Sequence, residues 1–205
     1  MIRQLTRPLL RPLTRPLVGM GGCERWVYNF DGVDDYAQFA EEIALTGDWF
    51  VEVACDIAVR PFVQDIISKE LFCKISLDSG GRFNFLVGDG SGWVVTLPEP
   101  TPSATGLRVV RGQKVGNTYT LLIDGVIRAQ VTRTNPVNPV VSHVGIRSNL
   151  SAASRVLGII FNVNINGHLY PINNPASAIQ TSVPDNGNPL TLFNTNQGRW
   201  SKIPC

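Results

Sequence analysis

The chain has 205 residues, of which 43% are hydrophobic and 17% are charged, and its formal net charge is +2 at pH 7. This length suits one domain with a proper core and argues against two domains. Residues 1–22 contain four arginines and no acidic residue, which leaves 14 basic against 16 acidic residues in the remainder. Any binding to nucleic acid would therefore depend on the N-terminal arginines, and we expect no nucleic-acid partner for the rest.

The N-terminal segment repeats Arg-Pro-Leu every four residues, at 7–9, 11–13 and 15–17. Proline at this spacing fixes φ and removes amide donors, so the segment can be neither a helix nor a central strand. We expect an extended or polyproline II arm, up to roughly 65 Å long at ~3.1 Å per residue. The recurring arginines exclude a secretory signal, and the prolines exclude the amphipathic helix of a mitochondrial presequence. The sequence thus predicts synthesis in the cytoplasm without secretion.

A basic arm on a mildly acidic body is typical of a segment that docks on an acidic partner surface or on nucleic acid. The alternative is a solvated, disordered tail. Leucines throughout the arm are costly to leave in water, and this favours docking. The residues predicted to carry assembly are Arg3, Arg7, Leu9, Arg11, Leu13, Arg15 and Leu17.

The first predicted element of the body is a β-hairpin over residues 28–39. Two aromatic, alternating segments flank Asp31-Gly32, which has the chemistry of a tight turn. Residues 36–45 are also the best helical candidate in the chain, because they contain Ala-Glu-Glu-Ile-Ala. Such a helix would be too short to determine the architecture.

Residues 49–59 alternate strictly, with apolar side chains on one face and Glu52 and Asp56 on the other. This pattern is typical of a strand with one buried face. Further alternating runs, separated by glycine-rich turns, cover residues 73–77, 83–87 and 93–97. Asp124-Gly125 then predicts a type I′ turn within a hairpin over residues 119–131, and a last core strand covers residues 157–165. Short strands at this spacing predict an all-β sandwich or barrel.

Three segments resemble concanavalin A-like, laminin-G-like domains, the superfamily of lectin and glucanase jelly rolls. They are Phe-Asp-Gly-Val-Asp-Asp-Tyr at 30–36, the hairpin around Asp124-Gly125, and Val-Gly-Ile-Arg at 144–147. The resemblance covers roughly residues 26–175 and implies a jelly-roll β-sandwich of two antiparallel sheets. We therefore divide the chain into the arm, residues 1–22, and the sandwich, residues 23–205. From about residue 171 the sandwich should end in an irregular wrap with one short edge strand.

Two motifs in the C-terminal segment resemble the sequence that follows laminin-G-like domains in bacteriophage structural proteins. They are Tyr-Pro-Ile-Asn at 170–173 and Asn-Gln-Gly-Arg-Trp at 196–200. The repeated arm is similar to the start of phage virion proteins. This resemblance implies a virion structural protein for capsid decoration, a tail or a fibre. Its partners would be other virion proteins, further copies of itself and a host-surface glycan, and it would have no membrane partner. A free carbohydrate-binding module of a bacterial protein is the alternative.

The sequence predicts no enzyme. His143 and His168 are isolated from any triad-like signature. Glucanases of this fold carry Glu-x-Asp-x-x-Glu, whose carboxylates act as nucleophile and general acid. Glu52 and Asp56 are the closest match to this motif in the chain, and we interpret them as residues on the solvent-facing side of a strand. The glycines at 88–92 precede no helix, so they predict a turn and not a phosphate loop.

Glycan recognition requires an exposed aromatic side chain beside fixed polar groups. Asp89 and Trp93, on a glycine-rich loop, are the best candidates, and Asn84 and Arg147 are the next candidates. Trp93 also begins an inward-facing alternating run, and this slightly favours a core position for it.

Asp31, Asp34 and Asp35 could hold calcium, since many lectins of this superfamily bind it through loop carboxylates. Turn capping explains them more simply, and we predict no cofactor and no other metal.

The four cysteines, Cys23, Cys55, Cys73 and Cys205, are widely scattered. Cys55 and Cys73 fall on apolar strand faces, so we expect two small buried side chains. A disulfide between them stays open if their strands are neighbours.

Overall fold

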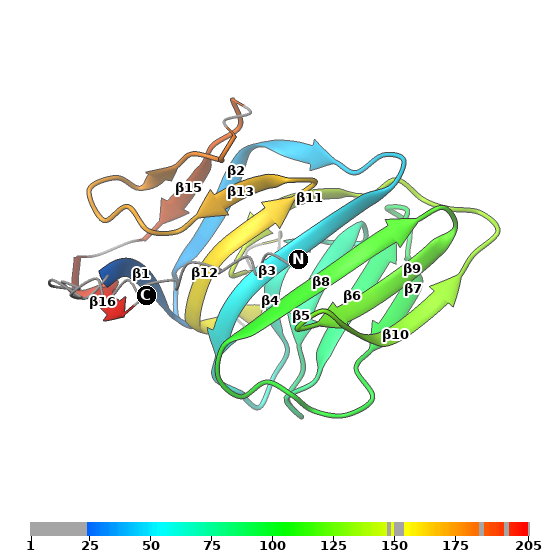
Figure 1. Cartoon of the computed structure of the whole chain (residues 1–205), viewed down its shortest axis with the longest axis horizontal. Coiled ribbons are helices and arrows are strands. Elements are labelled where there is room, and N and C mark those ends of the chain that lie inside the picture. The colour runs from blue at the N-terminus through cyan, green and yellow to red at the C-terminus, as the bar shows by residue number, and fades with distance from the viewer. Residues whose placement is uncertain (1–23, 147–148, 150–153, 185–186, 195–196, 205) are drawn as a thin grey trace, which may run out of the picture.

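The computed structural model describes residues 24–146, 149, 154–184, 187–194 and 197–204. Within these ranges the chain forms two eight-stranded antiparallel sheets and one short 3-10 helix, Gln197–Arg199. The sheets pack face to face as a sandwich (Figure 1), which confirms the all-β prediction. The predicted arm, residues 1–22, lies outside the described residues.

The first sheet, called sheet I, has the strand order β10-β9-β8-β3-β12-β1-β16, and β13 also pairs with β12. Its strands are β1 (Glu24–Asp31), β3 (Trp49–Ile57), β8 (Arg108–Val115), β9 (Thr118–Ile123), β10 (Val126–Thr132), β12 (Leu157–Ile165), β13 (His168–Pro171) and β16 (Trp200–Pro204).

The second sheet, sheet II, has the order β14-β15-β2-β11-β4-β5-β6-β7. Its strands are β2 (Tyr36–Ala44), β4 (Gln64–Lys69), β5 (Cys73–Leu77), β6 (Phe83–Gly88), β7 (Trp93–Pro98), β11 (Val140–Val144), β14 (Ile179–Gln180) and β15 (Leu190–Phe193).

The core lies between the inner faces of the two sheets. On β3 the predicted alternation holds, since every second side chain from Trp49 to Ile57 is buried. Phe85 of sheet II reaches across to Gly112 of sheet I, where a Cβ atom would lie 2.4 Å from its ring. Burial of such an aromatic side chain stabilises the fold by about 2 kcal/mol. Gly112 is therefore required by the close approach of the two sheets.

The predicted hairpin at residues 28–39 is wrong. The turn exists, and Gly32 adopts a φ of 72°, but β1 belongs to sheet I and β2 to sheet II. The connection therefore crosses from one sheet to the other. The Arg60 guanidinium donates a 2.9 Å hydrogen bond to the Gly32 carbonyl and holds the crossing in place.

The helical candidate at residues 36–45 is also wrong, because this segment is strand β2. β2 pairs with β11 on one side and β15 on the other, and Ala37 and Phe39 are buried in the core. Two hydrogen-bonded neighbours and a buried face outweigh the helix propensity of alanine and glutamate.

The C-terminal wrap contains three short strands, β14, β15 and β16, where we expected one edge strand. β15 lies inside sheet II, between β14 and β2. The β9–β10 hairpin follows the sequence prediction, since Asp124 and Gly125 have φ values of 52° and 75°, as a type I′ turn requires.

Cys55 and Cys73 are buried, as predicted, and both are free thiols. They lie on β3 and β5, in different sheets, so they do not form the disulfide left open above. Burial raises the pKa of both thiols well above the usual range. Cys23 and Cys205 lie outside the described residues. Within the described part of the chain, no helix is long and apolar enough to cross a membrane.

Candidate functional site

A groove runs over the outer face of sheet II, on strands β5, β6 and β7. Strand alternation places its residues, because Lys74 and Ser76 face outward between the buried Cys73, Ile75 and Leu77. The groove has a volume of about 260 Å³. It is lined by Val63, Lys74, Ser76, Asp78, Asn84, Leu86 and Thr96. This volume lies below the ~300–1,000 Å³ of drug-sized cavities, so the groove suits a small segment of a larger ligand.

Trp93 lies on this outer face and not in the core. The pairing of β6 with β7 shifts at Val87 and Gly88, where Gly88 pairs with Trp93 and Val87 pairs with Val95. Val94 is the extra residue of this bulge, and it packs against the core. A one-residue shift turns a side chain to the opposite face. Trp93 is therefore half-buried on the outer face, beside the groove rather than in its lining, and the favoured core position is wrong.

Lys74 connects Trp93 with the groove. Its Nζ lies 5.0 Å from the centroid of the Trp93 ring, a cation–π contact. The same Nζ lies 3.6 Å from Asp65 Oδ1 and 3.9 Å from Glu70 Oε2. Lys74 is only 6% exposed, so these contacts fix the lysine at the floor of the groove.

Asp78 and Asn84 line the other end of the groove. The Asp78 carboxylate accepts hydrogen bonds from the Gly80 and Arg82 amides and pairs with the Arg82 guanidinium at 2.9 Å. Burial acts to raise the pKa of Asp78, but these donors outweigh it and hold the pKa below its ordinary value. Asn84 donates from its side-chain nitrogen to the Arg82 carbonyl, which orients its amide.

The other predicted glycan-binding residues stand apart from the groove lining. Asp89 is exposed, and its carboxylate accepts hydrogen bonds from the Ser91 amide, the Ser91 hydroxyl and the Gly92 amide. It therefore caps the turn next to Trp93. Arg147 lies outside the described residues. Among the residues predicted for glycan binding, Asn84 and Trp93 share one face, about 13 Å apart along β6.

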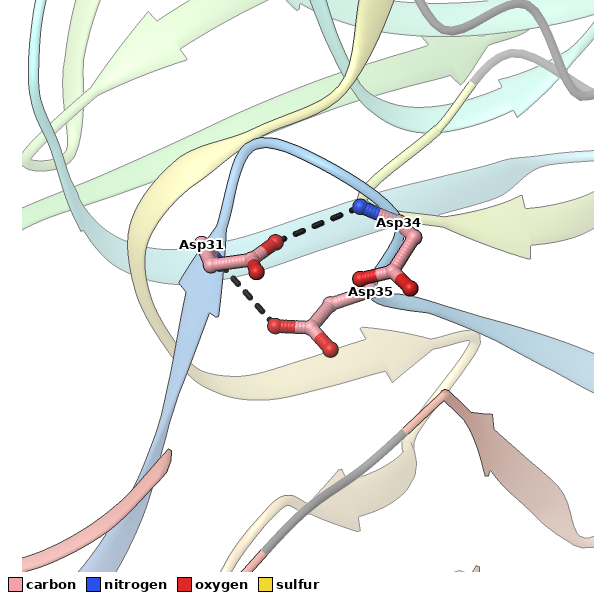
Figure 2. Close-up of side chains that lie close together, drawn as sticks. All are labelled: Asp31, Asp34 and Asp35. Carbon is pink, nitrogen blue, oxygen red and sulfur yellow. Dashed lines mark hydrogen bonds between the residues drawn. The ribbon is translucent and has the colours of Figure 1, made fainter. Parts of the chain in front are cut away.

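The acidic turn between β1 and β2 brings Asp31, Asp34 and Asp35 together, with carboxylate oxygens within 4.8 Å of one another (Figure 2). Asp31 accepts hydrogen bonds from the Val33 and Asp34 amides. Asp35 is buried, and its two oxygens accept from the Tyr28 hydroxyl at 2.9 Å and from the Asp31 amide at 3.0 Å. These bonds are turn capping of the kind the sequence suggested.

A guanidinium already neutralises the acidic turn. Arg199 lies 2.6 Å from Asp31 Oδ2 and 3.8 Å from Asp35 Oδ2. Burial raises the pKa of Asp35, whereas the amide donors and Arg199 outweigh burial at Asp31 and lower its pKa. Protein donors therefore engage the carboxylates of Asp31 and Asp35, while the Asp34 carboxylate is exposed, and calcium binding at this turn stays a prediction.

The remaining sequence candidates form no catalytic arrangement among the described residues. Glu52 pairs with Arg111 at 2.8 Å on the outer face of sheet I, and Asp56 is exposed on the same strand. Four residues of strand separate their Cα atoms by about 13 Å, beyond the separations of glycosidase carboxylates. His143 is buried beside Ser142, and desolvation lowers its pKa. His168 contacts the Pro184 carbonyl.

Comparison with solved structures identifies the architecture. A candidate carbohydrate-binding protein from Bacteroides ovatus aligns with a TM-score of 0.64 at 8% identity, over 88% of this chain and 60% of that one. A heptameric SAP-like pentraxin from Limulus polyphemus aligns at 0.53 and 11%, over 69% and 75%. Domains LG4-5 of the mouse laminin α1 chain align at 0.52 and 14%, over 82% and 48%.

The fold is a concanavalin A-like jelly roll. This confirms the fold implied by the sequence resemblance, and identities this low show the fold alone. The chain spans 60% of the length of the Bacteroides protein. No protein-family model matches the sequence, and no curated protein matches it either.

Sequence reasoning missed most of the groove, namely Val63, Lys74, Ser76, Asp78, Leu86 and Thr96. A signal for Lys74 and Ser76 was present, because the alternation of residues 73–77 already placed them outward. The neighbouring strands could not be aligned from sequence, so their outward residues could not be grouped into one surface.

Proposed function

We propose that the chain is a non-enzymatic glycan-binding module and that the groove on sheet II is its binding site. The observation that carries the proposal is the half-buried Trp93 beside a row of polar side chains on one sheet face. An aromatic ring offers an apolar surface to the C–H face of a sugar, and neighbouring hydroxyl and amide groups bond its hydroxyls. The Bacteroides neighbour's description as a candidate carbohydrate-binding protein supports the proposal.

The experiment is an immobilised-glycan array probed with the full chain, followed by calorimetry on the glycans bound. Trp93→Ala should weaken binding by about 10-fold to 100-fold, as loss of a central aromatic contact does. Trp26→Ala is the matched control, because Trp26 is 38% exposed and has Lys202 5.3 Å from its ring, but lies in sheet I. An array without any bound glycan, or equal losses in both variants, would contradict the proposal.

We further propose that this module is displayed on a bacteriophage virion and that the arm anchors it there. The support is the sequence of residues 1–22, whose Arg-Pro-Leu triplets offer leucines to apolar pockets and arginines to carboxylates. Proline reduces the entropy lost when such an arm docks. The protein would decorate a capsid, tail or fibre as a homo-oligomer and bind the host surface. As a free carbohydrate-binding module it would not need the arm.

Deletion of residues 1–22 separates these two roles. We expect the truncated protein to unfold cooperatively near the temperature of the full chain, because the described core lies entirely after residue 23. It should fail to enter virions. Unchanged incorporation would discard the virion role.

Substitutions within the arm test how it docks. Serine at Leu9, Leu13 and Leu17 should weaken assembly at least as much as lysine at Arg7, Arg11 and Arg15. If the arm instead tolerates serine and releases readily in salt, it works by charge alone and binds nucleic acid.

A further inference from the structure

Lys74 is the one cationic side chain among the described residues that line the groove. It sits on the floor and has three partners, the Asp65 carboxylate, the Glu70 carboxylate and the Trp93 ring. Asp65 is fully buried, so its contact with Lys74 is shielded from water. The positive charge of Lys74 is therefore already compensated by groups of this protein.

An anionic sugar would find no unpaired cation at either end of the groove. Near Trp93, its carboxylate or sulfate would approach Glu70 and Asp65 in order to reach Lys74, and would have to take the ammonium from them. Removing a partner from a buried charge is costly. At the other end, the Asp78 carboxylate accepts from the Gly80 and Arg82 amides and pairs with the Arg82 guanidinium at 2.9 Å, so the positive charge of Arg82 is already compensated there too.

An uncharged sugar meets none of these costs. The Asn84 amide and the Thr96 and Ser76 hydroxyls are neutral donors and acceptors that match sugar hydroxyls. Leu86 and Val63 supply apolar surface beside them. We infer that the groove selects neutral glycans and discriminates against sialylated, sulfated and uronic-acid sugars. This inference rests on the proposed glycan-binding function and names the ligand class of the same site.

The test is an array in which each neutral oligosaccharide is matched by its sulfated and sialylated derivatives. For the full wild-type chain we expect the charged derivative of each bound glycan to bind about tenfold more weakly or worse, a penalty typical of an unpaired like-charge contact. Measurement at low and high salt should show the difference shrink as salt screens the repulsion.

A charge variant locates the discrimination. Glu70→Gln keeps the shape of the side chain and removes one of the two carboxylates beside Lys74. It should strengthen binding of the charged derivatives by about threefold to tenfold, since the lysine charge is then less compensated, with little effect on neutral glycans. Glu41→Gln is the matched control, because Glu41 is exposed on β2 and is absent from the groove lining.

Charged derivatives that bind as tightly as their neutral parents would overturn the inference and leave the proposed function standing. Charged glycans whose binding Glu70→Gln and Glu41→Gln alter equally would also overturn it, because the discrimination would not arise at Lys74. If the wild-type chain binds no glycan at all, the proposed function fails and the inference falls with it.

Discussion

The acidic turn and the groove are both clusters of polar side chains, but their polar atoms have different partners. In the turn, Asp31 and Asp35 accept hydrogen bonds from backbone amides, from Tyr28 and from Arg199. In the groove, Ser76, Asn84 and Thr96 stand on strands whose backbone groups are already paired within sheet II. The carboxylates of the turn therefore stabilise the fold, whereas Asn84 and Thr96 stand on the outer face of sheet II as candidates for ligand contacts.

This difference shows why a cluster of carboxylates is weak evidence for a metal site. A turn that crosses between two sheets leaves several amides unpaired, and aspartate is the side chain that best accepts from them. The sequence shows the same residues whether they bond amides or an ion. Here the amide donors and Arg199, which only the structure reveals, favour the capping role.

The largest effect should come from Asp35→Ala. This substitution leaves the buried Tyr28 hydroxyl and the Asp31 amide without their acceptor. We expect a loss of about 3 kcal/mol in the free energy of unfolding, measured by denaturant titration. Asp34→Ala is the control from the same turn, because Asp34 is exposed and should leave the midpoint nearly unchanged. Equal effects of both variants would show that the turn is not the structural cluster described here.

Arg199→Ala should have the second largest effect. It removes the charge that neutralises Asp31 and Asp35 and joins the C-terminal segment to the turn. Because Arg199 is partly exposed, we expect about 1 kcal/mol of destabilisation in thermal unfolding. Lys202→Ala provides the comparison, since its pair with Glu24 is exposed at both partners and should contribute nothing measurable.

Acid should act on the two regions differently. Asp78 and Asp31 have pKa values below 3.8, so their stabilisation is complete above that value and is lost as pH falls through the folded-state pKa. Asp35 has a raised pKa, so its contribution grows as the solution becomes acidic. Asp78→Asn should therefore reduce the acid-induced fall in Tm by about 2–4 °C. An acid profile that Asp78→Asn leaves unchanged would contradict this expectation.

Asn84→Ala tests whether the groove is dispensable for folding. Because Asn84 lies on the outer face and its recorded side-chain bond goes only to Arg82, we expect stability within about 0.5 kcal/mol of wild type. Affinity for a bound glycan should fall about threefold to tenfold with the loss of one hydrogen bond. A large loss of stability in Asn84→Ala would show that the groove, like the acidic turn, contributes to folding.

Calcium should have the smallest effect. Millimolar calcium should leave the Tm of the wild-type chain unchanged, because Arg199 and backbone amides already engage the carboxylates of Asp31 and Asp35. Arg199→Ala offers the sharper measurement. If calcium stabilises that variant alone, the guanidinium stands in for a cation, and if it stabilises the wild type, the turn is a metal site.

The fold class was predictable because it depends on local signals. Period-two alternation gave the strands at residues 49–57, 73–77 and 83–88, and Asp124-Gly125 gave a turn whose positive φ values only a few residues tolerate. The sheet to which a strand belongs is not a local property. Asp31-Gly32 predicts a reversal of the chain, but the pairing of β2 with β11 and β15 determines that the reversal crosses the sandwich.

The candidate site was predictable only in part for the same reason. Asn84 could be placed outward from its own strand. Trp93 could not, because its face depends on one extra residue, Val94, in the pairing of β7 with β6. The role of Lys74 could not be predicted, because it depends on contacts with Asp65, Glu70 and Trp93, which lie in different strands and turns.

The pairing of β1 with β16 has a consequence for how the protein is made. Residues 24–28 of β1 pair with residues 200–204 of β16, so this pairing cannot form until β16 has been synthesised. On the ribosome, residues 200–204 must leave the exit tunnel before this edge of sheet I can close. Until then β1 offers unpaired backbone groups to other nascent chains. Substitutions that weaken the β1–β16 pairing should therefore promote aggregation during synthesis before they affect the stability of the finished fold.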